Sequence, residues 1–111
     1  MDLAVGYARF DVVLINLDPA AGSEIRKMRP CVVISPNELN RFVRTLIVAP
    51  LTTTSKTYPS RVGCTFAGTA GFIALDQIRT IDVARCVRRL GRLDAATGNH
   101  VLGVLREMFA L

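Results

Sequence analysis

The hydrophobic pattern of this chain changes its period once, near Asp94, and this change limits the folds that the chain can adopt. Upstream of Asp94, short runs of β-branched and apolar residues alternate with turn residues. Strands are predicted over 9–18, 31–35, 44–51, 61–66 and 71–75, with further short strands near 76–81 and 87–93. Short strands in this arrangement are typical of a small β-barrel.

Downstream of Asp94, apolar residues recur with the period of a helix. The predicted helix face consists of Val101, Leu102, Leu105, Met108 and Phe109. Asp94 is a good N-cap, because its carboxylate can accept hydrogen bonds from the first turn. A chain of 111 residues is long enough for one core. We therefore expect a single domain over 1–111, mainly β, built as a small, partly open barrel with a C-terminal helix.

Two loops interrupt the predicted strands. Residues 18–29 carry turn residues and no periodicity, and a loop of this length in so small a domain is usually functional or disordered. Residues 52–60 form a second loop, which is polar and rich in threonine. Between these loops, residues 36–40 predict one helical turn with Ser35 as its cap. Pro50 marks an edge or a bend.

The charge of the chain favours a polyanionic or acidic partner. Lysine and arginine number 14 against nine acidic residues, which gives a net charge of +5, and most of the cations are arginines. The planar guanidinium group binds phosphate through two donors at once, whereas lysine is a point charge. This bias favours nucleic acid as the partner.

Composition also argues against several classes of protein. No apolar run approaches the roughly 20 residues of a membrane span, and the N-terminus lacks the features of a signal peptide, so we expect a cytoplasmic protein without a membrane partner. Three cysteines without CxxC spacing and a single histidine do not form a metal-binding pattern. We expect no metal and no cofactor.

The segment over 18–35 points to chemistry. An acid, Glu24, and the pair Arg29-Pro30 lie on the predicted loop just before a strand. Proline favours an extended conformation in the residue before it, so the Arg29 side chain should project from the mouth of the barrel. The loop therefore carries opposite charges where a substrate could approach.

Four motifs in this order resemble the MazF/PemK family of mRNA-interferase toxins. They are LDPAAGSE at 17–24, RPCVVIS at 29–35, VAPLTTTSK at 48–56 and DQIRTI at 76–81, and the match extends over nearly the whole chain. The resemblance implies an SH3-like barrel, a homodimer, cleavage of single-stranded RNA at short sequences and inhibition by a cognate antitoxin. Given the positive charge of the chain, we expect that antitoxin to be acidic and partly disordered.

The resemblance also assigns roles to individual positions. Arg29 and Thr52 fall where the family has its catalytic arginine and hydroxyl, and Glu24 falls on the acid of the loop. The positions associated with RNA binding or catalysis are Asp76, Gln77, Arg79 and Arg85, together with Ser55 and Lys56 of the threonine-rich segment. Ala74 departs from the PemK branch, which has an arginine there, so a mechanism that needs that arginine cannot operate in this chain.

The expected chemistry fits these side chains. RNA supplies its own nucleophile, the 2′-OH, so the protein has to provide a base, positive charge for the phosphorane and help for the leaving oxygen. Arg29 suits the charge, and Thr52 can donate a hydrogen bond to a phosphate oxygen. Glu24 or Asp76 is the better base, since arginine is essentially never deprotonated in proteins.

Two other hypotheses remain open at this stage. A CcdB-type toxin has a related fold and acts by binding DNA gyrase, without catalysis. A degenerate toxin would keep the fold and the antitoxin contact but lack activity. The set of Glu24, Arg29 and Thr52 favours the ribonuclease, because a gyrase-binding protein has no need of it.

Overall fold

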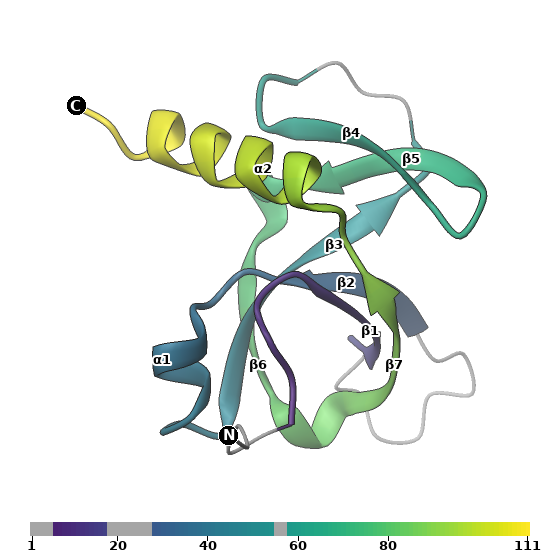
Figure 1. Cartoon of the computed structure of the whole chain (residues 1–111), viewed down its shortest axis with the longest axis vertical. Helices are drawn as coiled ribbons and strands as arrows, with labels where there is room; N and C mark the ends of the chain where they lie inside the picture. Colours follow the sequence, from purple (N-terminus) through teal and green to yellow (C-terminus); the bar gives the residue numbers. More distant parts are fainter. Residues whose placement is uncertain (1–5, 18–27, 55–57) are drawn as a thin grey trace.

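The computed structural model describes residues 6–17, 28–54 and 58–111. Its strands are β1 (Asp11–Asn16), β2 (Met28–Val33), β3 (Thr45–Thr52), β4 (Arg61–Phe66), β5 (Thr69–Ala74), β6 (Arg79–Asp82) and β7 (Cys86–Arg92) (Figure 1). The helices are α1 (Asn37–Asn40) and α2 (Ala95–Met108), with 3-10 turns η1 (Leu75–Gln77) and η2 (Val83–Arg85). The expected mainly β, partly open barrel with a C-terminal helix is confirmed.

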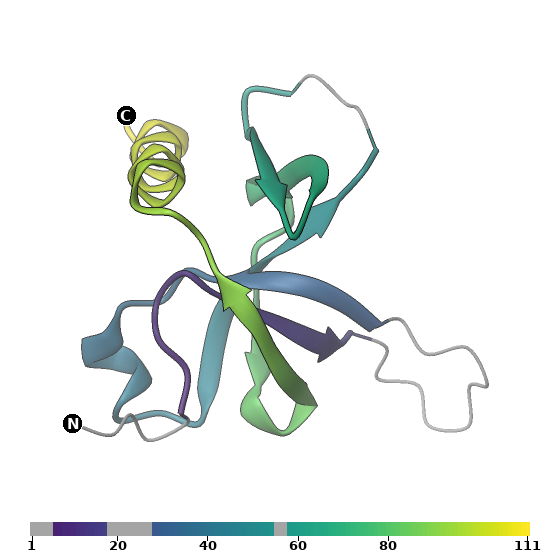
Figure 2. The ribbon, with the colours of Figure 1, turned by 45° about the vertical axis from the view of Figure 1, so that its right-hand side comes forward.

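Strand β3 joins the two parts of the sheet. The strand order is β4-β5-β3-β2-β1-β7, with β6 also paired to β3, and every pairing is antiparallel. Within β3, residues 45–48 pair with β6, residues 48–50 pair with β2, and Leu51 and Thr52 pair with β5. Pro50 is therefore the last residue of β3 that pairs with β2. In Figure 2 the β4–β5 hairpin and α2 both lie above the remaining strands, with α2 at the left and the hairpin at the right.

The strands at the centre of the sheet are buried on both faces. One face of β1, β2 and β3 packs Val12, Val32 and Ala49 against Val101 of α2. The other face encloses a second core, formed by Val13, Ile15, Cys31, Val33, Leu46, Val48 and Ile81. Burial on both faces explains why β1 and β2 read as continuous apolar runs instead of alternating patterns.

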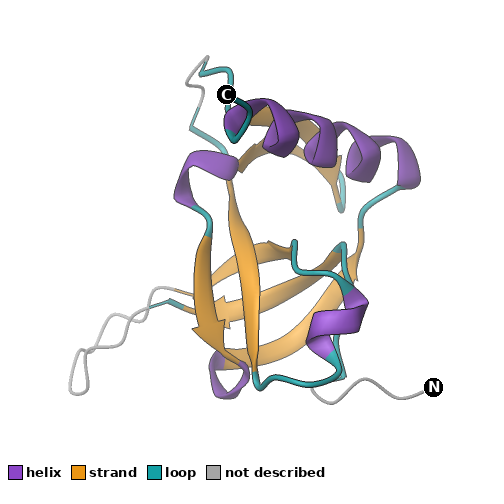
Figure 3. Ribbon diagram, turned by 90° about the vertical axis from the view of Figure 1, so that its left-hand side faces the viewer, coloured by secondary structure: helices purple, strands orange, loops and turns teal. Residues whose placement is uncertain are grey.

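Helix α2 begins as the sequence predicts but extends beyond the core. Asp94 caps it and accepts hydrogen bonds from the Thr97 backbone N–H at 3.0 Å and the Thr97 hydroxyl at 2.7 Å. Val101 is fully buried, whereas Met108 is 37% exposed and Phe109 is 70% exposed. The apolar face predicted from the sequence is therefore buried at Val101 and exposed at its C-terminal end. Figure 3 shows α2 at the end of the molecule that also holds the β4–β5 hairpin.

The expected cap of α1 is also wrong. The N-cap residue is Pro36, and no side chain caps the turn. The Ser35 hydroxyl instead donates a hydrogen bond to Asn40 Oδ1 at 2.6 Å and accepts one from the Ile47 backbone N–H at 3.1 Å. Ser35 and Asn40 are both buried, so each needs an internal partner.

Among the described residues, neither helix combines the length and the hydropathy needed to cross a membrane.

Candidate active site

Arg29 lies inside a strand, where a loop position was expected. Strand β2 begins at Met28, and Arg29 pairs with Ile15 of β1. The prediction that residues 18–29 form one loop is therefore wrong at its C-terminal end. The reason is long-range pairing, since β1 extends far enough to hold Met28 and Arg29 in the sheet. Residues 18–27, including Glu24, lie outside the described residues.

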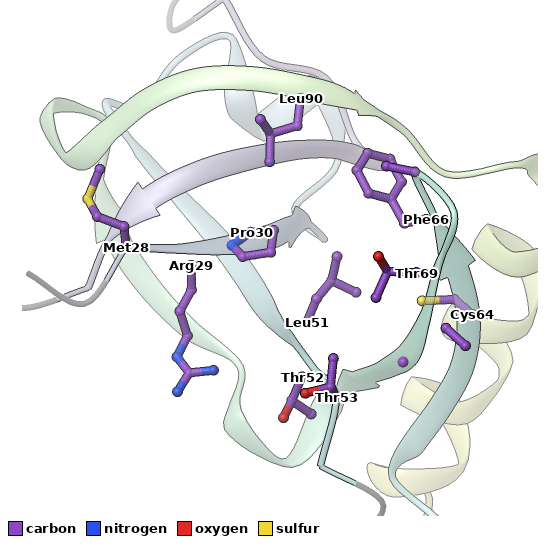
Figure 4. A pocket seen from close by; sticks show the side chains of 13 residues that line it. Met28, Arg29, Pro30, Leu51, Thr52, Thr53, Cys64, Phe66, Thr69 and Leu90 are labelled. Atoms are coloured by element: carbon purple, nitrogen blue, oxygen red, sulfur yellow. The ribbon is translucent and has the colours of Figure 1, made fainter.

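The register of β2 and β3 brings Arg29 and Thr52 together. Cys31 pairs with Pro50, the last pair between these strands, and Arg29 and Thr52 each lie two residues beyond it on the same side. Both residues lie on the face of the sheet that carries Cys31 and Val48, because side chains alternate along a strand. Figure 4 shows the Arg29 guanidinium and the Thr52 hydroxyl on the same side of the pocket.

Two hollows meet at this pair of residues. The larger has a volume of about 540 Å³ and a mainly apolar lining that includes Pro30, Leu51, Cys64, Phe66 and Leu90. The smaller has a volume of about 450 Å³ and is lined by Leu17, Arg29, Pro50, Thr52, Thr54, Tyr58, Arg61 and Gln77. Arg29 and Thr52 line both hollows, so a chain that crosses from one hollow to the other passes this pair.

The charge of Arg29 is available to a ligand. Its side chain is exposed and forms no ion pair with any other described residue. Arg89 and Arg92, by contrast, share one acid, since both contact Asp11, each at 3.1 Å. Arg29 can therefore give its full charge to an anion.

The backbone around Thr52 fixes its hydroxyl. The Thr54 backbone N–H donates a hydrogen bond to Thr52 Oγ1 at 3.1 Å, which leaves the hydroxyl proton free to be donated. Strand β5 approaches closely from the other side. A Cβ atom at Gly71 would lie 2.7 Å from the Thr52 carbonyl oxygen, so only glycine fits without a shift of the backbone.

Asp76 is engaged by Arg61. Arg61 Nε donates to Asp76 Oδ1 at 2.7 Å, and Arg61 Nη2 donates to Oδ2 at 3.2 Å. The Ser60 hydroxyl donates to Oδ1 at 3.2 Å. The hydrogen bonds from Arg61 hold the pKa of Asp76 below its usual range. A carboxylate that is held in this way is a poor base, so the geometry disfavours Asp76 for that role.

The other predicted site residues are more scattered. Gln77 lines the smaller hollow. Arg79 and Arg85 line neither hollow. Arg79 is exposed on β6, and Arg85 Nη1 donates a hydrogen bond to the Asn16 carbonyl oxygen at 3.5 Å. Ser55 and Lys56 lie outside the described residues.

The cysteines are not candidates for a nucleophile. Burial raises the pKa of the Cys31 thiol to about 12 and that of Cys86 to about 11, and it also raises the pKa of Cys64. Such thiols carry little thiolate, which is the reactive form. Among the residues that the structure describes, no three of the histidines, cysteines and acids are grouped as metal ligands.

Comparison with known proteins decides the family. Residues 8–109 match the family described as PemK-like, MazF-like toxin of type II toxin–antitoxin systems. The chain belongs to this toxin family. The resemblance seen in the four motifs is thereby confirmed.

Relatives of this toxin carry enzyme names. Endoribonuclease EndoA of Bacillus subtilis is 39% identical, and the match covers 93% of this chain and 94% of the relative. Endoribonuclease PemK of Escherichia coli is 36% identical, with 87% of this chain and 77% of the relative covered. Among solved structures, a MazE–MazF complex from Deinococcus radiodurans superimposes with a TM-score of 0.79 at 28% identity. The match covers 95% of this chain and 96% of the matched chain in the complex.

One residue of this toxin's site was missed by sequence reasoning. Arg61 was interpreted only as the start of a strand, yet it lines the smaller hollow together with Arg29 and Thr52. An arginine directly after a polar loop was the available signal. That signal is weak in a chain that carries arginine at many strand ends.

Proposed function

We propose that this toxin is an endoribonuclease that cuts single-stranded RNA at short sequences, without a metal, through the RNA's own 2′-OH. The observation that supports the proposal is that Arg29 and Thr52 both line the two hollows. Enzyme names among its relatives support the same conclusion. Cleavage of messenger RNA would place its action in the cytoplasm.

The proposed reaction is a transesterification at phosphorus. The 2′-oxygen bonds to the phosphorus atom, its proton passes to a base, and the bond from phosphorus to the 5′-oxygen breaks as that oxygen takes up a proton from water. Arg29 would stabilise the added charge on the phosphorane with its planar donors. The Thr52 hydroxyl would donate a hydrogen bond to a non-bridging oxygen. Of the two carboxylates expected as the base, Glu24 is the one that we propose, since Asp76 is bound to Arg61.

The direct test is primer extension on a long RNA after incubation with the purified protein. We expect discrete cuts at a short recurring sequence, at equal rates with EDTA and with added Mg²⁺, because no role in the proposed reaction is assigned to a metal. Heat-inactivated protein is the control. Cleavage that EDTA abolishes and Mg²⁺ restores would contradict the metal-free mechanism.

The proposal includes two partners. Met108 at the end of α2, and Phe109 and Leu111 just after it, are exposed apolar residues that a second copy of the chain would cover in a homodimer. Sedimentation at micromolar concentration measures the oligomeric state, and a monomer alone would count against the homodimer.

A cognate acidic antitoxin is the second partner, since an acidic segment complements the net charge of +5.

A further inference from the structure

Arg61 is held more firmly than the other arginine of the smaller hollow. Its side chain is only 7% exposed, and two of its nitrogens are bound to the Asp76 carboxylate. The Tyr58 ring lies on another side, with its centre 5.2 Å from the guanidinium carbon. These contacts fix the plane of the guanidinium before any ligand arrives.

The local fold explains why Asp76 reaches Arg61. Arg61 pairs with Ala74 at the end of β5, and the chain then turns into η1, where Asp76 lies. The Leu75 backbone N–H donates to the Ser60 carbonyl oxygen at 3.0 Å, which fixes this turn beside the start of β4. An arginine at position 61 and an acid at position 76 are therefore brought together by the backbone itself.

The fixed guanidinium still has donors to offer. The two contacts with Asp76 use Nε and Nη2 of Arg61. The third nitrogen, Nη1, has no hydrogen-bond partner within the described residues. Arg61 lines the hollow that also contains Arg29 and Thr52. A substrate that presents its phosphate to Arg29 would therefore pass the free donors of Arg61.

The two arginines differ in what they can contribute. Arg29 is exposed and carries no ion pair with the described residues, so it suits charge that develops during the reaction. The charge of Arg61 is largely balanced by Asp76, but its orientation is fixed. A preorganised donor loses little conformational entropy on binding, which suits it to holding the substrate in place.

We propose that Arg61 binds a phosphate of the RNA next to the scissile one, and that Asp76 is a positioning residue that acts on the reaction only through Arg61. This inference rests on the proposed ribonuclease function. It changes the role of Asp76 from contact with RNA to orientation of a neighbouring side chain.

The test is a kinetic cycle of Arg61→Ala, Asp76→Ala and the double variant. Losing a hydrogen bond between charged groups should lower kcat/KM by about 10- to 100-fold for Arg61→Ala, mainly through KM. Asp76→Ala should lower it less. In the double variant, kcat/KM should stay within about twofold of the value for Arg61→Ala, because Asp76 has no other route to the substrate. Effects that multiply would overturn the inference, as would an Arg61→Ala protein that cuts at the wild-type rate.

Binding provides a readout that a purely structural role would not change. The probe is the same RNA with a 2′-deoxy sugar at the scissile position. Loss of one phosphate contact should reduce the slope of log K against log salt concentration by about 0.7 for a single strand. An unchanged slope for Arg61→Ala would overturn the inference. If the wild-type protein cuts no RNA but binds it with this dependence on Arg61, the binding role stands and the ribonuclease function fails.

Arg92→Ala is the matched control. Arg92 is also an arginine paired with an aspartate, Asp11. It lies beside Asp11 at the start of β1, whereas Arg29 lies beside Ile15 near the end of β1. Asp11 keeps its second partner, Arg89, in this variant. We expect unchanged kcat/KM and an unchanged salt slope. Melting temperatures close to that of the wild type in all variants show that the fold is retained.

Discussion

Replacing Arg29 by lysine should slow RNA cleavage by about 30- to 1,000-fold, and replacing it by alanine should slow it further. Lysine keeps the charge but loses the planar pair of donors that holds two phosphate oxygens at once. Removing one preorganised donor from a transition state costs about 2–4 kcal/mol, which gives this range of rates. Single-turnover cleavage of a defined RNA measures the effect.

Affinity and folding separate this effect from general damage. Arg29→Lys should weaken RNA binding much less than it slows cleavage, because the charge that attracts the RNA remains. The fold should tolerate both changes, since the Arg29 side chain is exposed. Arg106→Lys, on the exposed side of α2, is the control and should cut normally. A folded Arg29→Ala protein that still arrests growth would favour a toxin of the gyrase-binding kind.

An RNA with a 2′-deoxy sugar at the scissile position should resist cleavage at that position almost completely. The 2′-OH is an intramolecular nucleophile, and such groups provide effective concentrations of about 10⁵ M or more, which water cannot replace. The same RNA with a 2′-deoxy sugar one nucleotide away should be cut normally and is the control. Gel analysis of end-labelled RNA measures both.

The chemistry of the ends gives a second readout of that experiment. Attack by the 2′-oxygen leaves a 2′,3′-cyclic phosphate on one fragment and a 5′-OH on the other. Kinase labelling detects the free 5′-OH without prior phosphatase treatment. Cleavage of the 2′-deoxy substrate at the normal rate would show that water is the nucleophile, and the role given to Thr52 and Arg29 would then have to be reassigned.

Local sequence patterns predicted most of the secondary structure. Apolar runs identified β1 and β3, the Asp94 cap identified the start of α2, and β4 was placed at 61–66 as observed. Patterns could not show that β2 begins at Met28. Its first three residues are Met28, Arg29 and Pro30, which do not form an apolar run, and they join the sheet because β1 pairs with them from across the loop.

The candidate site was predictable only in part. Family motifs named Arg29 and Thr52, but their adjacency is a property of the β2–β3 register, which the spacing of the residues in the chain does not reveal. The contact between Arg61 and Asp76 depends on the β4–β5 register and on the turn at η1. Local propensity predicts neither, so Arg61 was found only in the structure.

The glycine at position 71 restricts how this pocket can be altered. Any side chain there would press on the main chain that carries Thr52, since even a Cβ atom would lie 2.7 Å from the Thr52 carbonyl oxygen. A laboratory library that varies the pocket lining to change the preferred RNA sequence should therefore keep this position constant. Phe66 and Leu90 are better places for diversity, because their side chains line the larger hollow from strands that do not carry Arg29 or Thr52.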